Sequence, residues 1–145
     1  MKLVIQRVES ARVEVEGKLV SKIGKGFLIL MGVSAKDDGS EIQWLVQKTV
    51  GLRIFQDAEN KMNLSLRDVN GEILLVSQFT LYANCKKGKR PSLIDAAQPD
   101  KAEHFYNIFA KELEKNGIKT KKGIFGAFMK VSLKNDGPVT IILER

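Results

Sequence analysis

The sequence predicts a compact α/β domain that spans residues 1–145. Two observations lead to this prediction. Several short apolar stretches of strand length are separated by Gly, Asn and Asp residues, which is typical of β-strands joined by turns. Two longer stretches, at about 41–51 and 99–116, repeat their apolar residues at helical spacing. The length suits a single domain, and a hydrophobic content of 43% is sufficient for an ordinary core.

Three strands are predicted in the first quarter of the chain. Apolar residues largely alternate over residues 3–15, and Glu16-Gly17-Lys18 provides a turn into a hairpin partner at residues 19–23. Residues 26–33 are continuously apolar between glycines, which indicates a strand buried on both faces.

Both helices are predicted from their apolar faces and from the residues at their ends. Ser40 followed by Gln43 is a capping-box pattern at the start of the first helix. Pro99 suits the first turn of the second helix, and Asn116-Gly117 suits its end. The expected buried faces are Ile42, Leu45, Val46 and Thr49 in the first helix, and Ala102, Phe105, Phe109 and Leu113 in the second.

The remaining strands are shorter or less regular. Asn70-Gly71 is a turn signal that leads into a predicted central strand at 72–79. Residues 84–98 are polar and basic and are expected to be irregular. Further strands are expected at 53–55, 63–66, 128–133 and 139–143, with Asn135-Asp136-Gly137-Pro138 joining the last two.

The charge balance favours an anionic partner. A formal net charge of +7 points to nucleic acid before an acidic membrane surface. No apolar run approaches the roughly 18 residues of a membrane span, and residues 1–17 are too charged for a signal peptide. The single cysteine, Cys85, excludes an intrachain disulfide. We therefore expect a soluble cytoplasmic protein.

The single histidine excludes two common hydrolase chemistries. His104 and Cys85 cannot complete a tetrahedral zinc site. A Ser-His-Asp triad would need His104, which the helical pattern directs at solvent. We therefore expect neither a metal nor a cofactor.

The candidate catalytic residues are Ser77, Gln78, Phe79 and Thr80, at the end of the predicted central strand. A nucleophilic Thr80 needs a base, and no histidine, lysine or carboxylate lies within three residues of it. Backbone N–H groups that stabilise an oxyanion are the alternative. A strand with one polar edge and no catalytic role explains the same residues.

A dense basic loop follows this segment and is a candidate phosphate-binding site. It contains Lys86, Lys87, Lys89 and Arg90, with Gly88 allowing close approach of the backbone. A solvated loop explains this composition equally well, but the net positive charge favours RNA or a nucleotide. A second basic run at 115–122 could extend the same surface.

Gly137-Pro138 has two interpretations. A Gly-Pro pair between two strands is ordinarily part of a hairpin turn. The functional alternative is a cis peptide bond, which sets two carbonyl groups side by side in a way that side chains cannot easily imitate.

These motifs closely resemble those of the D-aminoacyl-tRNA deacylases over essentially the whole chain. The most specific parts are residues 77–83 and 135–140, in the right order and at the right separation. Further matches lie at 4–8, 24–26, 52–55, 61–66, 88–92 and 125–129. The resemblance implies mixed β-sheets that form a barrel-like core with the two main helices.

The resemblance also implies a homodimer with its active sites at the subunit interface. Such an enzyme hydrolyses the ester that joins a D-amino acid, or glycine, to the 3′-terminal adenosine of tRNA. By resemblance, the four residues from Ser77 to Thr80 line the ester, and Phe125 and Met129 shape the adenosine pocket. Lys86, Lys87, Lys89 and Arg90 would then contact the tRNA.

Chiral selection is implied by the same resemblance. A cis Gly137-Pro138 bond, held in place by Arg7, would enter the partner's pocket and inspect the α-carbon of the substrate. A rigid backbone wall admits glycine and D-amino acids and refuses every L-amino acid without reading the side chain.

Two other functions remain open from the sequence. A non-catalytic basic nucleic-acid-binding module would use the loop at 86–90 and would leave the segment at 77–80 unexplained. A small-molecule ester or thioester hydrolase would not need the loop cations. Of the three, the deacylase explains the most residues.

Overall fold

The computed structural model describes all residues of the chain, 1–145. One long bent strand, β1 (Lys2–Val15), pairs with three other strands and organises the fold. The first half of this strand pairs with one neighbour and its second half with another, while a strand from the C-terminus runs along its other edge. The strands are β1 (Lys2–Val15), β2 (Lys18–Ile23), β3 (Gly26–Gly32), β4 (Phe55–Gln56), β5 (Met62–Leu64), β6 (Glu72–Ser77), β7 (Thr120–Lys122) and β8 (Lys130–Glu144).

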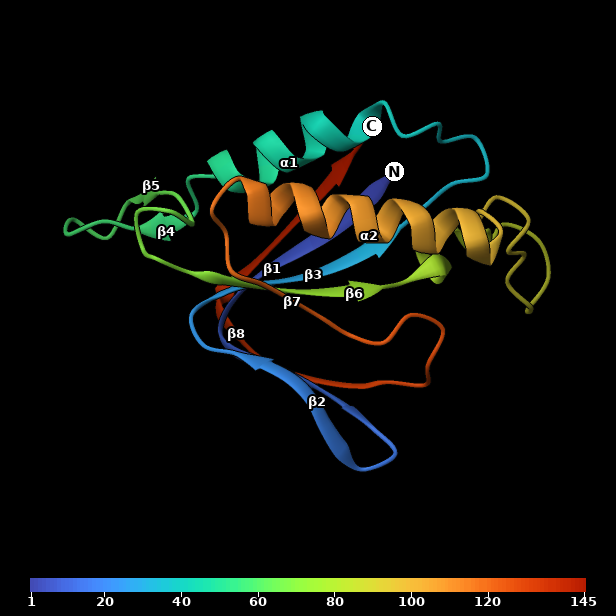
Figure 1. The fold of residues 1–145 in the computed structure, drawn as a ribbon, viewed down its shortest axis with the longest axis horizontal. Coiled ribbons are helices and arrows are strands. Elements are labelled where there is room, and N and C mark those ends of the chain that lie inside the picture. Colours follow the sequence, from blue (N-terminus) through green and yellow to red (C-terminus); the bar gives the residue numbers. More distant parts are fainter.

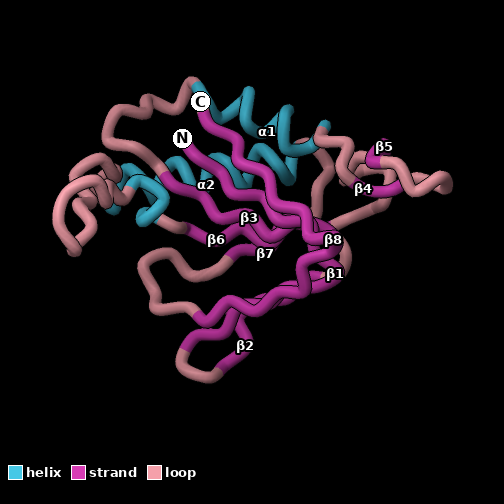
Figure 2. Tube along the Cα trace, turned by 180° about the vertical axis from the view of Figure 1, so that it is seen from behind, coloured by secondary structure: helices cyan, strands magenta, loops and turns pink.

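The main sheet is mixed and has the order β2-β1-β3-β6-β7, with β8 paired to the free edge of β1. The β3–β6 and β6–β7 pairs are parallel, and the others are antiparallel. Figure 2 shows β1 and β8 running side by side from the chain ends to the hairpin of β2. At the far side, the Ser21 hydroxyl donates to the Lys122 carbonyl (2.9 Å) and so links β2 to β7. The sheet is thus nearly closed into the barrel-like shape implied by the resemblance.

Two helices, α1 (Glu41–Gly51) and α2 (Pro99–Lys115), cover one face of this sheet (Figure 1). The larger core lies between the helices and the sheet, where the rings of Phe27 and Phe55 stack with centroids 5.1 Å apart. A smaller core fills the curl of the sheet on its other side and includes Val8, Leu28 and Leu74. The strands β3 and β6 therefore have apolar partners on both faces, which explains their continuous apolar sequences.

The prediction of two helices is confirmed. The C-terminal end of the second helix and the predicted cap of the first need correction. The first helix has the predicted bounds, and the second ends at Lys115, with Gly117 adopting a positive φ of 80° just beyond it. The capping box at Ser40 is wrong, because Ser40 is helical and its side chain makes no capping bond. Instead, the Asp38 carboxylate accepts the Ser40 N–H at 2.9 Å, and hydrogen bonds from Ser40 lower the pKa of Asp38.

The buried face of α2 also differs from the prediction. Tyr106, Phe109, Ala110 and Leu113 are buried, whereas Ala102 and Phe105 are only partly covered. His104 is exposed, as predicted. The buried face of α2 therefore includes Tyr106, which was not among the predicted residues.

Two strand predictions are wrong in ways that bear on function, and one strand was not predicted. The strand predicted to reach Phe79 ends at Ser77, and Phe79–Tyr82 form a 3-10 helix, η1. The segment from Asn135 to Pro138 does not join two strands, because β8 runs continuously past it. It lies instead where the register of β8 against β1 shifts, opposite Gln6 and Val8. The strand β7 was not predicted, since its sequence is too short and too charged to show a strand pattern.

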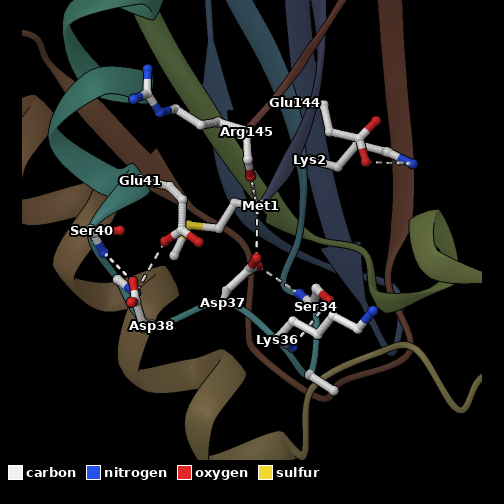
Figure 3. A network of polar contacts seen from close by, with 12 residues as sticks. Met1, Lys2, Ser34, Lys36, Asp37, Asp38, Ser40, Glu41, Glu144 and Arg145 are labelled. Carbon is white, nitrogen blue, oxygen red and sulfur yellow. Dashed lines mark hydrogen bonds and ion pairs between the residues drawn. The ribbon is translucent and has the colours of Figure 1, made fainter.

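The two chain ends meet beside the loop that follows β3, as Figure 3 shows. The buried ammonium group of Met1 donates to the Asp37 carboxylate at 2.9 Å and to the Arg145 carbonyl at 2.6 Å. Asp37 also accepts the Ser34 N–H at 2.7 Å. The same loop then holds residues 95–97, because the Ala35 N–H donates to the Asp95 carbonyl (2.9 Å).

None of the helices is both long and apolar enough to cross a membrane.

Candidate active site

A pocket of about 500 Å³ lies where β6, the start of α2 and the loop at 123–129 meet. Its lining is mostly apolar, with the polar groups of Ser77, Gln78 and Gln98 at its edge. Among the predicted site residues, five line this pocket, namely Ser77, Gln78, Phe79, Phe125 and Met129. An apolar pocket of this size with few polar groups is typical of a site for a small organic ligand.

The backbone at the pocket's edge carries two unpaired donors. The parallel pairing of β6 with β3 ends at Ser77 and Met31, and the Gln78 N–H makes the last bond, to the Met31 carbonyl at 2.7 Å. The chain then leaves the sheet as η1. The first N–H groups of a helix have no partner inside it, and those of Phe79 and Thr80 donate to no acceptor elsewhere in the protein. Two adjacent free N–H groups can bind an oxyanion.

The Thr80 hydroxyl lies outside the lining of the pocket and lacks a base. Its only side-chain partner is the amide of Gln78, which donates to Thr80 Oγ1. No carboxylate, lysine or histidine hydrogen-bonds to this oxygen. The arrangement therefore favours backbone electrostatics over nucleophilic attack by Thr80.

The opposite wall of the pocket is aromatic and rests on α2. The Tyr106 hydroxyl donates to the Leu75 carbonyl at 2.8 Å, and its ring centroid is 5.9 Å from that of Phe125. Burial raises the pKa of Tyr106, so the phenol stays neutral and cannot act as a base at neutral pH. Tyr106 was not predicted from the sequence, although a residue three positions before Phe109 lies on the same, buried face of the helix.

Close approach of the backbone shapes the same wall. A Cβ atom on Gly123 would lie 2.6 Å from Met129 Sδ, so this glycine lets the methionine pack across the chain. Gly123 also donates its N–H to the Leu75 carbonyl at 2.9 Å, which ties the loop to the sheet. The aromatic and methionine side chains are therefore supported from β6.

A second cluster of predicted residues lies elsewhere, on β1 and β8. The Gly137-Pro138 bond is cis, and both residues are exposed. Beneath them, Arg7 is only 2% exposed and donates from Nε to the Asp136 carbonyl at 3.0 Å. Its Nη1 donates to the Ile54 carbonyl, and Nε also lies 3.1 Å from the Asp136 carboxylate. The bend in β8 lies at the far end of the sheet from η1 in Figures 1 and 2, and neither Gly137 nor Pro138 lines the pocket.

The basic loop extends from the end of the molecule where η1 lies (Figure 1). Asn84 and Ser92 close it through a pair of backbone hydrogen bonds of 2.8 and 2.9 Å. The cations between them, Lys86, Lys87, Lys89 and Arg90, are all exposed and form no salt bridge within the chain. Positive charge that is not neutralised internally is available to an anionic partner.

The second basic run is engaged in internal contacts. Lys121 donates to the Lys22 carbonyl at 2.7 Å, Lys122 donates to Asn107 at 2.9 Å, and Lys115 pairs with Glu112. These contacts hold the short strand β7 and the end of α2. They account for three of the four lysines of the run, all but Lys119, and leave the loop at 86–90 as the clearer anion-binding surface.

Unpaired backbone donors beside an apolar pocket are the arrangement expected of a hydrolase that stabilises an oxyanion. Comparison with known proteins agrees with this class. A family described as D-Tyr-tRNA(Tyr) deacylase matches residues 4–144. A D-aminoacyl-tRNA deacylase of Fusobacterium nucleatum is 56% identical over 99% of this chain and 95% of its own. One from Pelobacter propionicus is 55% identical over the full length of both chains.

Two solved structures share the fold. A structure titled c-Myc DNA Unwinding Element Binding Protein is 44% identical, with a TM-score of 0.93 over 100% of this chain and 99% of its own. A probable eukaryotic D-amino acid tRNA deacylase shares the fold, with a TM-score of 0.83 at 17% identity over 98% of this chain and 97% of its own. The chain therefore belongs to the D-Tyr-tRNA(Tyr) deacylase family and is a hydrolase.

Arg7→Lys should destabilise the protein and loosen the bend of β8. A lysine cannot donate to Ile54 and Asp136 in the fixed directions of the guanidinium, so at least one buried acceptor is left unpaired, at a cost of about 1–3 kcal/mol. Urea unfolding measures the loss, and amide exchange of Val139 measures the loosening. Arg12→Lys, at an exposed pair with Glu14, is the control and should change stability by less than about 0.5 kcal/mol. Equal effects of both variants would contradict the anchoring role of Arg7.

Proposed function

We propose that this protein is a cytoplasmic D-aminoacyl-tRNA deacylase that releases a free D-amino acid and tRNA. The observation that carries the proposal is the pair of free N–H groups of Phe79 and Thr80 at the edge of an apolar pocket. The terminal adenosine would occupy the pocket between Phe125, Met129 and Tyr106, because flat apolar and aromatic walls suit a nucleobase. This pose brings the ester at the 3′-oxygen to the free donors.

The reaction then needs water, the backbone N–H groups and the 2′-hydroxyl of the substrate itself. A water molecule, activated by the neighbouring 2′-hydroxyl of the ribose, attacks the ester carbonyl. The Phe79 and Thr80 N–H groups stabilise the negative charge that develops on the carbonyl oxygen. The tetrahedral intermediate collapses with cleavage of the bond to the 3′-oxygen, which leaves with a proton. No protein side chain forms a covalent bond, in agreement with the absence of a base beside Thr80.

Chiral selection in this proposal uses a second copy of the chain. Gly137 and Pro138 project from a bend of β8 that is remote from the pocket of their own chain, so they can serve only another subunit's pocket. Their backbone would stand on one side of the substrate α-carbon and exclude the side chain of an L-amino acid. Glycine has no side chain to exclude, so mischarged glycyl-tRNA is also a substrate.

The surface around the pocket supports a homodimer with the active sites at its interface. Large apolar side chains are exposed on the segments that line the pocket, among them Phe79 (55%), Phe128 (87%) and Ile94 (83%). Neighbouring exposed apolar residues of this size mark an interaction surface on a soluble protein. In addition, β8 pairs only with β1 and offers a free edge next to the bend.

The first test compares D-tyrosyl-tRNA with L-tyrosyl-tRNA at equal enzyme and low salt. The D-ester should be hydrolysed rapidly and the L-ester left intact, because only the L side chain meets the backbone wall. Release of free tyrosine measures both rates. Equal, slow loss of both esters would indicate a general esterase, and salt-sensitive binding without turnover would indicate a plain nucleic-acid-binding module.

The backbone mechanism is tested by Phe79→Pro against Phe79→Ala. Proline is compatible with this position, since residue 79 is the first of η1 and Gln78 before it is not helical (φ −147°, ψ 81°). Both variants lose the ring, but only proline loses the N–H group, so its single-turnover rate should be lower by a further factor of about 10²–10³. Thr80→Ala should retain most of the activity. A loss of several orders of magnitude in Thr80→Ala, with tRNA binding retained, would instead support a nucleophilic threonine.

The basic loop should affect tRNA affinity and leave the chemical step unchanged. Lys87→Gln/Lys89→Gln should weaken binding and reduce the slope of log affinity against log salt by about one to two units. The matched control is Lys48→Gln/Lys111→Gln, on the exposed side of the two helices. Filter binding over a salt series and the rate at saturating enzyme separate the two effects. An unchanged affinity in the loop variant would exclude these cations from the tRNA site.

A further inference from the structure

The 3-10 helix that carries the free N–H groups rests on a bare patch of backbone. Gly32 ends β3, next to Met31, whose carbonyl accepts the last bond of β6. A Cβ atom at Gly32 would lie 3.0 Å from Leu81 Cβ, 3.1 Å from the Gln78 carbonyl oxygen and 3.3 Å from Tyr82 Cδ2. Separations of this kind are tighter than ordinary packing. A side chain at residue 32 would therefore require η1 to shift by a few tenths of an ångström.

A lysine on the neighbouring strand holds the same helix from the side. Lys2 is the partner of Gly32 across the β1–β3 pair. Its Nζ lies 3.5 Å from the Leu81 carbonyl and 5.1 Å from the centroid of the Tyr82 ring. It also pairs with Glu144 at 3.4 Å, so it links η1 to the C-terminal strand. The two residues together form a seat for η1, with Gly32 beneath it and Lys2 beside it.

The seat contacts the second half of η1, Leu81 and Tyr82, together with the Gln78 carbonyl just before the helix. Leu81 and Tyr82 line a separate shallow groove with Lys2, whereas Gln78 and Phe79 line the main pocket. One turn of helix thus has its supported side against Gly32 and its reactive side at the pocket. A shift of Leu81 and Tyr82 is expected to move the Phe79 and Thr80 N–H groups as well, because these four residues form one 3-10 turn.

We infer that Gly32 is a positioning residue for the deacylation, and that Lys2 assists it by fixing η1 at the distance from β3 that the oxyanion donors require. This inference rests on the proposed function for its catalytic consequence. The geometric part, that the size of residue 32 sets the position of the Phe79 and Thr80 N–H groups, stands independently. Hydrogen-bond donors lose much of their effect when displaced by a fraction of an ångström, so the rate of the chemical step should report the displacement.

The test is Gly32→Ala in the full-length protein, with Gly51→Ala as its matched control. Gly51 ends α1, and a Cβ atom there would meet nothing within 4 Å. For Gly32→Ala, the single-turnover rate on D-tyrosyl-tRNA should fall about tenfold or more, while the dissociation constant for tRNA changes less than about twofold. The control should match the unsubstituted protein in both. An unchanged rate in Gly32→Ala, or an equal loss of binding and rate, would overturn the positioning role.

A second measurement does not depend on activity. The ¹⁵N–¹H spectrum of Gly32→Ala should show its largest amide shifts at residues 78–82, including Phe79 and Thr80. If Gly32→Ala fails to fold, Lys2→Met should shift the same amides to a smaller extent and lower the rate without weakening tRNA binding. Unmoved Phe79 and Thr80 amides in the folded variants would refute the inference. Moved amides in a protein that never hydrolyses the D-ester would instead refute the proposed function and leave the geometric part intact.

Discussion

The parallel pairing of β3 with β6 determines where the unpaired N–H groups of Phe79 and Thr80 lie. This ladder stops at Met31 and Ser77, with the Gln78 N–H as its last donor. Beyond Gln78 the chain leaves the sheet as one turn of 3-10 helix. The two N–H groups that follow Gln78 have no strand to pair with and no earlier helical turn to accept them. The same ladder also places Leu75 to hold Tyr106 and Gly123, so both walls of the pocket are supported by β6.

The other functional cluster depends on one buried charge. Arg7 donates hydrogen bonds to two backbone carbonyls, that of Ile54 in a loop and that of Asp136 in β8. A buried guanidinium is retained in a fold only when its donors are satisfied, and here the backbone satisfies them. Asn135 completes the anchorage by accepting the Val139 N–H at 2.8 Å. The exposed Gly137-Pro138 pair is thus held from below by fixed hydrogen bonds, as the proposed rejection of a substrate by shape would require.

The sequence predicted those parts of the fold that follow a regular period. The helix at 41–51 was placed to the residue, because Ile42, Leu45, Val46 and Thr49 repeat on one face. The hairpin at Glu16 and Gly17 was also found, since both residues take the positive φ that the turn requires. The predictions failed at the points where the periodic pattern of apolar residues is interrupted. Nothing local says that Phe79 begins a 3-10 helix or that β8 continues past Pro138, because both outcomes are imposed by partners distant in the sequence.

The candidate site shows the same limit more sharply. Ser77, Gln78 and Phe79 were identified by their place after an apolar strand, and Phe125 and Met129 through the family resemblance. Tyr106 and Gly32 were missed, because one appears as an ordinary helix residue and the other as the end of a buried strand. Both support the site through what touches their backbone or ring, and an amino-acid sequence records those neighbours only indirectly. A site made of main-chain donors and a main-chain wall has few characteristic side chains. Its specificity therefore depends on glycines and on packing distances, and these become visible only when the chain is folded.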